Sequence, residues 1–120
     1  ECGALNTPGC VALAESTELL LEVGPERIER RVLALTERLC ERLNECGASV
    51  TSPRQLPEER SGIVTWRVAS GRPEQLREAF ERERLAVNVA ADGTILASPH
   101  FYNTFEEVER AAEVSCGVSG

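Results

Sequence analysis

Residues 94–108 have the sequence TILASPHFYNTFEEV, which carries the most informative local pattern in this chain of 120 residues. The β-prone run up to Ser98 predicts a strand, and the polar and aromatic residues after it predict an exposed corner. Thr104 and Glu107 have the spacing of a capping box, in which each side chain binds the backbone N–H of the other residue. We therefore expect a strand, an exposed corner and a capped helix, in that order.

A second strand is expected directly before this one. Residues 85–90 and 94–98 are apolar segments joined by Ala91-Asp92-Gly93. An Asp-Gly pair between two apolar segments is a strong hairpin signal, so the two strands should be antiparallel neighbours. The other elements predicted in this half of the chain are strands at 48–52 and 62–68 and a helix at 74–84 that Pro73 opens.

Two helices are predicted in the first part of the chain. Residues 8–23 are rich in helix formers, and Gly24-Pro25 ends that run. Proline is well tolerated in the first turn of a helix, so Pro25 also begins the next one, which should end near Gly47. Leu19–Leu21 give the first helix more apolar surface than one buried stripe can hold. The buried stripe of the second helix is Ile28, Val32, Leu35, Leu39 and Leu43.

The order of the predicted elements is ααββαββα. Such an order suits an α/β fold, an α+β two-layer sandwich in which a small, mostly antiparallel sheet carries its helices on one face. No linker, repeat or low-complexity tract divides the sequence, and its length is that of one domain, so residues 1–120 are expected to form a single domain. Residues 116–120 are expected to form a frayed tail.

Composition argues against several classes of partner. The net charge is −7, and all 13 basic residues are arginines interleaved with glutamates, which is unlike a nucleic-acid surface. No apolar run approaches the ~18 residues that a spanning helix needs. We therefore expect neither a nucleic-acid nor a membrane partner.

The cysteines indicate the redox compartment. Cys2, Cys10, Cys40, Cys46 and Cys116 form no C-x-x-C pair, and a single histidine is present, so no metal site is expected. We expect free thiols in a reducing, cytoplasmic environment.

Residues 98–104, SPHFYNT, together with the opening ECGALNTPG at residues 1–9, resemble the last third of class V aminotransferase-like enzymes. These pyridoxal-phosphate (PLP) proteins form part of the aspartate aminotransferase superfamily, fold type I, and include cysteine desulfurases. By its pattern the tail is most similar to the isopenicillin N epimerase-like and general class V branch. The resemblance implies that the chain is the small C-terminal domain, with residues 1–9 from the junction with the large PLP-binding domain. It also implies a homodimeric parent.

The head of the chain departs from the family pattern E-x-G-T-x-N. The family's threonine hydroxyl binds the cofactor phosphate, and Ala4 stands at its position, whereas Asn6 matches. The resemblance implies that both residues lie on the phosphate side of the cofactor. Loss of a hydroxyl that donates to a charged phosphate weakens binding by about 1.5–3 kcal/mol. A turn that feeds the first helix explains the matching residues equally well.

The tail departs from the family pattern R-x-S-x-x-x-Y-N-T. Its arginine binds the α-carboxylate of the substrate, and Leu96 stands at that position, while Ser98 and Asn103 match. The resemblance implies a substrate pocket lined by Leu96, Ser98, His100 and Asn103. Because leucine cannot neutralise a carboxylate, another group holds the substrate, or the substrate is not an ordinary α-amino acid, or the site has degenerated.

Three residues near the expected pocket have two interpretations each. His100, the only histidine, is a candidate acid or base, or it satisfies local backbone groups. Asn103 touches substrate or, as we favour, supports the turn before the Thr104 cap. Arg60 resembles a loop position near the family's pocket mouth, or is an ordinary surface arginine.

The chain has no lysine, so it cannot form the Schiff base that holds PLP in this superfamily. Cysteine desulfurases carry a long loop with a nucleophilic cysteine between the last two strands, where this chain has only residues 91–93. We expect PLP in the parent enzyme, no cofactor on this chain alone and no catalytic residue within it. A stand-alone, non-enzymatic binding module descended from the domain is the alternative, since Ala4 and Leu96 both lack the family's polar group.

Overall fold

The computed structural model describes residue 3 and residues 5–118 and confirms the predicted order of helices and strands. Each strand is shorter than the sequence predicts, and one turn of 3₁₀ helix lies in the loop before the second strand. The elements are α1 (Thr7–Val23), α2 (Pro25–Glu45), β1 (Ser49–Val50), η1 (Pro57–Glu59), β2 (Val64–Arg67), α3 (Pro73–Arg82), β3 (Asn88–Val89), β4 (Ile95–Ala97) and α4 (Phe105–Gly117).

The four strands form one sheet in the order β1-β2-β4-β3, and each neighbouring pair is antiparallel. The hairpin expected between β3 and β4 is present, and Gly93 provides its left-handed position at φ 82°. In the centre of the sheet Leu96 pairs with Thr65 of β2 on one side and with Asn88 of β3 on the other.

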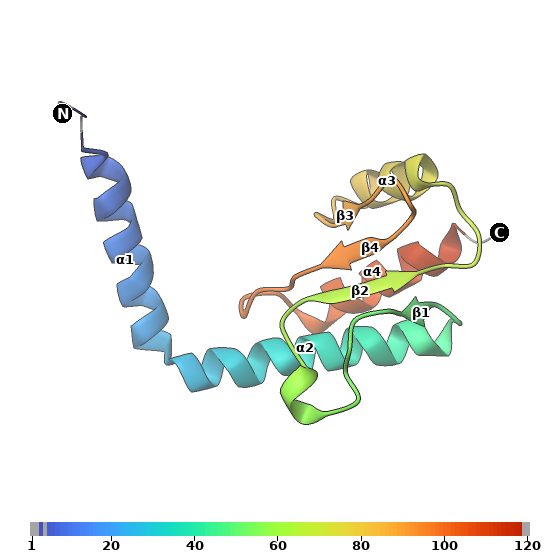
Figure 1. The fold of residues 1–120 in the computed structure, drawn as a ribbon, viewed down its shortest axis with the longest axis horizontal. Coiled ribbons are helices and arrows are strands. Elements are labelled where there is room, and N and C mark those ends of the chain that lie inside the picture. The colour runs from blue at the N-terminus through green and yellow to red at the C-terminus, as the bar shows by residue number, and fades with distance from the viewer. Residues whose placement is uncertain (1–2, 4, 119–120) are drawn as a thin grey trace.

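The sheet is covered on one side. In Figure 1, α4 lies behind β2 and β4, with α2 and α3 along the two edges of the sheet. Val64, Trp66 and Ile95 are fully buried against these helices. Side chains alternate along a strand, so their neighbours Thr65 and Leu96 lie on the opposite face, which no helix in the described part of the chain covers. We call this the open face.

Trp66 lies at the centre of the core. It is fully buried, and its indole Nε1–H donates to Ser115 Oγ of α4 at 3.1 Å. Ser115 in turn donates to the Ala111 carbonyl at 2.7 Å, so both buried polar groups are satisfied. The helices contribute chiefly Leu35, Leu39, Leu43, Leu76, Phe80, Val108 and Ala112 to the same core.

The helices α2 and α4 run side by side in the same direction. Near their beginnings, the Arg31 guanidinium lies 4.5 Å from the centre of the Phe105 ring. Halfway along, Arg38 Nε donates to Glu109 Oε1 at 2.6 Å. The Glu109 carboxylate raises the pKa of the Arg38 guanidinium by accepting its hydrogen bond, which favours the charged form of the arginine.

The expectation that all cysteines are free is wrong, because Cys46 and Cys116 form a disulfide with a Cα–Cα distance of 6.2 Å. The expected frayed tail is also wrong in its first residues, because α4 continues through Cys116 to Gly117. The two cysteines are 70 residues apart, and no local pattern indicates that parallel packing of α2 and α4 brings them together. Of the other described cysteines, Cys10 is exposed and Cys40 is buried, both as free thiols.

We predict that the Cys46→Ser/Cys116→Ser double variant is less stable than the wild type by about 2–4 kcal/mol. A cross-link between residues far apart in the sequence restricts the unfolded chain, and its loss removes that restriction. Urea denaturation without reductant measures the difference, and adding reductant to the wild type should reproduce it. Cys10→Ser is the control and should match the wild type. Equal stability of the double variant would contradict the cross-link.

The same C-terminal motif ends α2 and α3, but with different residues in its left-handed position. Gly47 occupies that position after α2 with φ 81°, and Arg84 occupies it after α3 with φ 57°. The motif is closed after α3 by the Leu85 N–H, which donates to the Phe80 carbonyl at 2.9 Å. Arg84 is the one non-glycine residue with positive φ in the described chain, and a side chain there costs about 1–2 kcal/mol relative to the right-handed region.

Helix α1 projects away from the rest of the fold (Figure 1). None of its residues is buried, and even the apolar side chains of Leu13, Leu19 and Leu21 are each more than half exposed. Glycine at Gly24, with φ 95°, allows the sharp change of direction between α1 and α2. The excess apolar surface expected from the sequence is therefore exposed in the structure.

We predict that the 120-residue chain self-associates through α1 in a concentration-dependent way, because removing this apolar surface from water is favourable. Sedimentation velocity over a concentration series measures it. Leu13→Glu/Leu21→Glu should shift the chain to monomer, while Glu15→Gln on the same helix should not. A strict monomer at every concentration would contradict the prediction.

Candidate functional site

The corner between β4 and α4 is a closed turn. The His100 N–H donates to Asn103 Oδ1 at 2.8 Å, and the Asn103 N–H donates back to the His100 carbonyl at 3.0 Å. Arg31 of α2 donates to the Asn103 carbonyl at 2.9 Å and so ties the turn to the helix layer. The side chain of Asn103 thus supports the turn, which is the role that we favour from the sequence.

The capping box predicted after the corner is present. Thr104 Oγ1 accepts from the Glu107 N–H at 3.2 Å, and Glu107 Oε2 accepts from the Thr104 N–H at 2.8 Å. The amide of Asn103 also donates to Glu107 Oε2, at 3.0 Å. The Thr104 N–H, and then the Asn103 amide, lower the pKa of the Glu107 carboxyl, because both hydrogen bonds favour its charged form.

We predict that Glu107→Gln destabilises the chain at pH 7 and has a smaller effect near pH 3. The pKa of Glu107 is lower in the folded state than its ordinary value of about 4.3. Its contribution is therefore fully present above that value and disappears as the pH falls through the folded-state pKa. Urea denaturation at both pH values measures this. Glu106→Gln, at the neighbouring exposed position, is the control, and a pH-independent effect of Glu107→Gln would refute the assignment.

Three of the four residues expected in a substrate pocket lie together. Ser98, His100 and Asn103 line one cavity of about 450 Å³, which we call the corner pocket. Its floor is formed by core residues of α2 and α4, so it lies on the side of the sheet that the helices cover. Leu96 does not line it, because Leu96 is on the open face between Thr65 and Asn88. The structure therefore separates Leu96 from the other three residues.

Aromatic rings fix the side chain of His100 at the rim of this pocket. The His100 ring stacks on Tyr102, with centroids 4.3 Å apart and an interplanar angle of 22°. It also lies 4.6 Å from the Phe101 ring in a tilted arrangement. Among the described residues, neither ring nitrogen of His100 has a hydrogen-bond partner, so both are available to a ligand.

The residues expected on the phosphate side of a cofactor lie elsewhere. Asn6 Oδ1 accepts from the Gly9 N–H at 3.1 Å and caps α1, and the beginning of α1 is far from the corner (Figure 1). Ala4 lies outside the described residues. Asn6 therefore has a structural role in this chain, because it caps the turn that begins α1.

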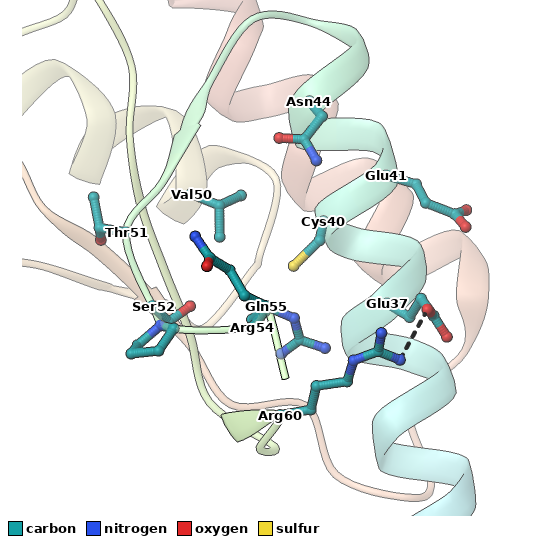
Figure 2. Close-up of a pocket in the computed structure, with 11 residues that line it drawn as sticks. Glu37, Cys40, Glu41, Asn44, Val50, Thr51, Ser52, Arg54, Gln55 and Arg60 are labelled. Atoms are coloured by element: carbon teal, nitrogen blue, oxygen red, sulfur yellow. Dashed lines mark hydrogen bonds and ion pairs between the residues drawn. The ribbon is translucent and has the colours of Figure 1, made fainter. Parts of the chain in front are cut away.

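A second pocket, of about 690 Å³, lies between α2 and the segment that follows β1. Figure 2 shows the Cys40 thiol directed from α2 toward Gln55, and Arg60 paired with Glu37, Nη1 to Oε1 3.4 Å. Burial raises the pKa of the Cys40 thiol, so this cysteine is a neutral thiol rather than a nucleophile at pH 7. Arg60 thus lies at a pocket edge, in an exposed ion pair.

Arg54 is a residue of this second pocket that the sequence does not single out. Its Nη2 donates to Thr36 Oγ1 at 3.1 Å, and its Nη1 donates to the Ser61 carbonyl at 3.3 Å. Thr36 is fully buried in α2. Arg54 therefore holds the loop against α2, and no periodicity or motif could have predicted a contact between positions so far apart.

The open face has an uncharged centre and a neutralised edge. Thr65, Leu96 and Asn88 lie side by side across three strands. Arg67, at the end of β2, donates to Thr94 Oγ1 at 3.1 Å and pairs with Asp92 in the hairpin turn. The described strand residues of this face offer polar and aliphatic contacts, and the one cation among them, Arg67, is paired.

Comparison with known proteins defines the class to which this fold and corner belong. Residues 1–111 match the family described as aminotransferase class V. The match covers most of the chain, and the chain belongs to this family. The resemblance seen in residues 1–9 and 98–104 is therefore confirmed.

Relatives of the chain include proteins described as cysteine desulfurases. The chain is 27% identical over 121 residues to a "Probable cysteine desulfurase" of Pyrococcus abyssi, covering 91% of this chain and 30% of that protein. It is 31% identical over 129 residues to one from Aeropyrum pernix, covering 94% and 31%. The apo structure of a cysteine desulfurase from Thermococcus onnurineus NA1 matches the whole chain with a TM-score of 0.86 and 28% identity, over 33% of its own length. The chain spans about a third of the length of these relatives.

No helix in the described part of the chain combines the length and the apolar character needed to cross a membrane.

Proposed function

We propose that the chain is the small C-terminal domain of a PLP-dependent, class V aminotransferase-like or epimerase-like enzyme. Its partner is the large PLP-binding domain of the same parent chain, over whose cofactor pocket it closes, and residues 1–9 come from the junction between the two. The parent is a cytoplasmic homodimer that this domain helps to support. By itself the domain is not catalytic.

The bare open face is the observation that carries this proposal. A small antiparallel sheet normally buries one face and solvates the other, yet here the centre of the uncovered face is the half-buried Leu96 rather than a charged residue. The exposed apolar residues of α1 point to a second missing contact. The chain covers about a third of the length of its relatives. The open face and the apolar side of α1 are therefore the surfaces against which the other two-thirds of such a protein would pack.

The residues of this chain do not form a PLP site. No lysine is available for a Schiff base, Ala4 has no hydroxyl, and the side chain of Asn6 caps α1. No step through the cofactor follows from these residues, so lysine and most phosphate contacts are assigned to the rest of the parent. The domain's own contribution is the wall formed by the open face, with Leu96 at its centre.

The short turn between β3 and β4 argues against persulfide formation of the kind that cysteine desulfurases perform. Residues 91–93 form a tight hairpin turn, which leaves no room there for a long loop bearing a nucleophilic cysteine. Cys40 is a buried, neutral thiol on α2 and cannot replace that nucleophile. The proposed reaction class is therefore transfer or epimerisation rather than persulfide formation.

We predict that the isolated chain does not form an internal aldimine with PLP. Borohydride reduction after mixing, followed by peptide mapping, should find label only at the α-amino group, because the chain has no lysine. Acetylation of the N-terminus is the matched control and should remove that residual label. Stoichiometric label on an internal residue would contradict the prediction.

A stand-alone binding module descended from this domain is the second candidate, favoured by the replacement of two ligand-facing polar groups by Ala4 and Leu96. The coding sequence upstream of Glu1 distinguishes the two. A large α/β segment that carries a lysine before Glu1 supports the enzyme domain, and a start codon immediately upstream of Glu1 supports the module.

A further inference from the structure

Arg84 holds a backbone conformation that favours glycine. It occupies the left-handed position after α3, which Gly47 occupies after α2, with the same pair of closing hydrogen bonds. The fold therefore does not require an arginine there. Strained non-glycine residues that persist in proteins cluster at ligand sites, where the side chain rather than the backbone is needed.

The side chain of Arg84 has no partner in the described chain, whereas its neighbour Glu83 pairs with Arg110 Nη2 at 2.5 Å. Several other arginines of the fold are held by acids or carbonyls, as Arg38 is by Glu109 and Arg77 by the Val89 carbonyl. Arg84 shares the lack of a partner with surface arginines such as Arg82, and it differs from them in lining the corner pocket. The guanidinium of Arg84 thus keeps its five donors for water or a ligand.

Arg84 lines the corner pocket, which has an apolar floor and a polar rim. Leu39, Val108 and Ala111 are buried and apolar, and they form part of the floor. Arg84, Ser98 and Tyr102 are exposed side chains with hydrogen-bonding groups at the rim. An apolar floor with a few convergent polar groups, in a volume of about 450 Å³, has the character of a small-molecule site.

The acid of this pocket does not neutralise Arg84. Glu107 is the single carboxylate among the described lining residues, and its Oε2 is already bound by the Thr104 N–H and the Asn103 amide. The available rim groups are therefore the Arg84 guanidinium, the hydroxyls of Ser98 and Tyr102, and the ring nitrogens of His100. Together they favour an anionic ligand group.

We propose that the corner pocket binds a small carboxylate with an aliphatic body, and that Arg84 receives the carboxylate. Two parallel N–H groups of a guanidinium match the two oxygens of a carboxylate, and the apolar floor accepts the aliphatic part. The site is contained entirely in this chain and lies on the helix-covered side of the sheet, opposite Leu96. It therefore does not depend on the proposed role in a PLP enzyme.

Titration of the ¹⁵N-labelled chain with 4-methylpentanoate tests the site. Saturable shifts in the backbone amides of residues 84–87 and 98–103 are expected, with a dissociation constant in the millimolar range or tighter. The neutral 4-methylpentanamide has the same aliphatic body and should bind at least about tenfold more weakly. Equal binding of acid and amide, or the absence of saturable shifts, would overturn the proposal.

Three substitutions distinguish the contribution of the Arg84 side chain to binding from its effect on folding. Arg84→Gln should weaken 4-methylpentanoate binding at least about tenfold, whereas Arg82→Gln removes the same charge two residues away and should leave it unchanged. Arg84→Gly should lose binding while raising Tm by a few degrees, because glycine relieves the backbone strain. Unchanged binding in Arg84→Gln or Arg84→Gly, or equal losses in Arg84→Gln and Arg82→Gln, would refute the role of Arg84.

Discussion

The buried contact between Trp66 and Ser115 connects the two layers of the fold. The indole fills the centre of the core, and its single polar group finds a partner only because α4 lies directly across β2. Once Trp66 faces the helices, strand alternation fixes which residues face the other way. The open face, with Leu96 at its centre, is thus a direct consequence of where the tryptophan points.

The packing of α4 against α2 also restrains the turn between β4 and α4. Because α2 and α4 are parallel, the beginning of α4 meets Arg31 of α2, which binds the Asn103 carbonyl and lies over Phe105. The turn is held by its own backbone, by the Glu107 carboxylate and by α2 at once. A corner restrained from three directions can present Ser98 and His100 in one arrangement, and it loses little conformational entropy when a ligand binds.

Local sequence signals predicted most of the elements, and non-local contacts account for what they missed. The Asp92-Gly93 hairpin, the Thr104 capping box and the apolar stripe of α2 depend on residues a few positions apart, so their patterns are visible in the sequence. The Cys46–Cys116 disulfide and the contact of Arg54 with Thr36 depend on how whole elements pack. Arg84 was missed because glycine usually marks the left-handed position that ends a helix.

The disulfide also changes the connectivity of the molecule. Cys46 and Cys116 close a covalent ring that contains every strand of the sheet, α3 and nearly all of α4, while α1 and α2 lie outside it. Residues 55–60, between β1 and β2, are exposed and include Arg60, so they are an accessible place for a protease to cut. A single cut there opens the ring without releasing a fragment, so the two pieces of a nicked chain stay covalently joined until the disulfide is reduced.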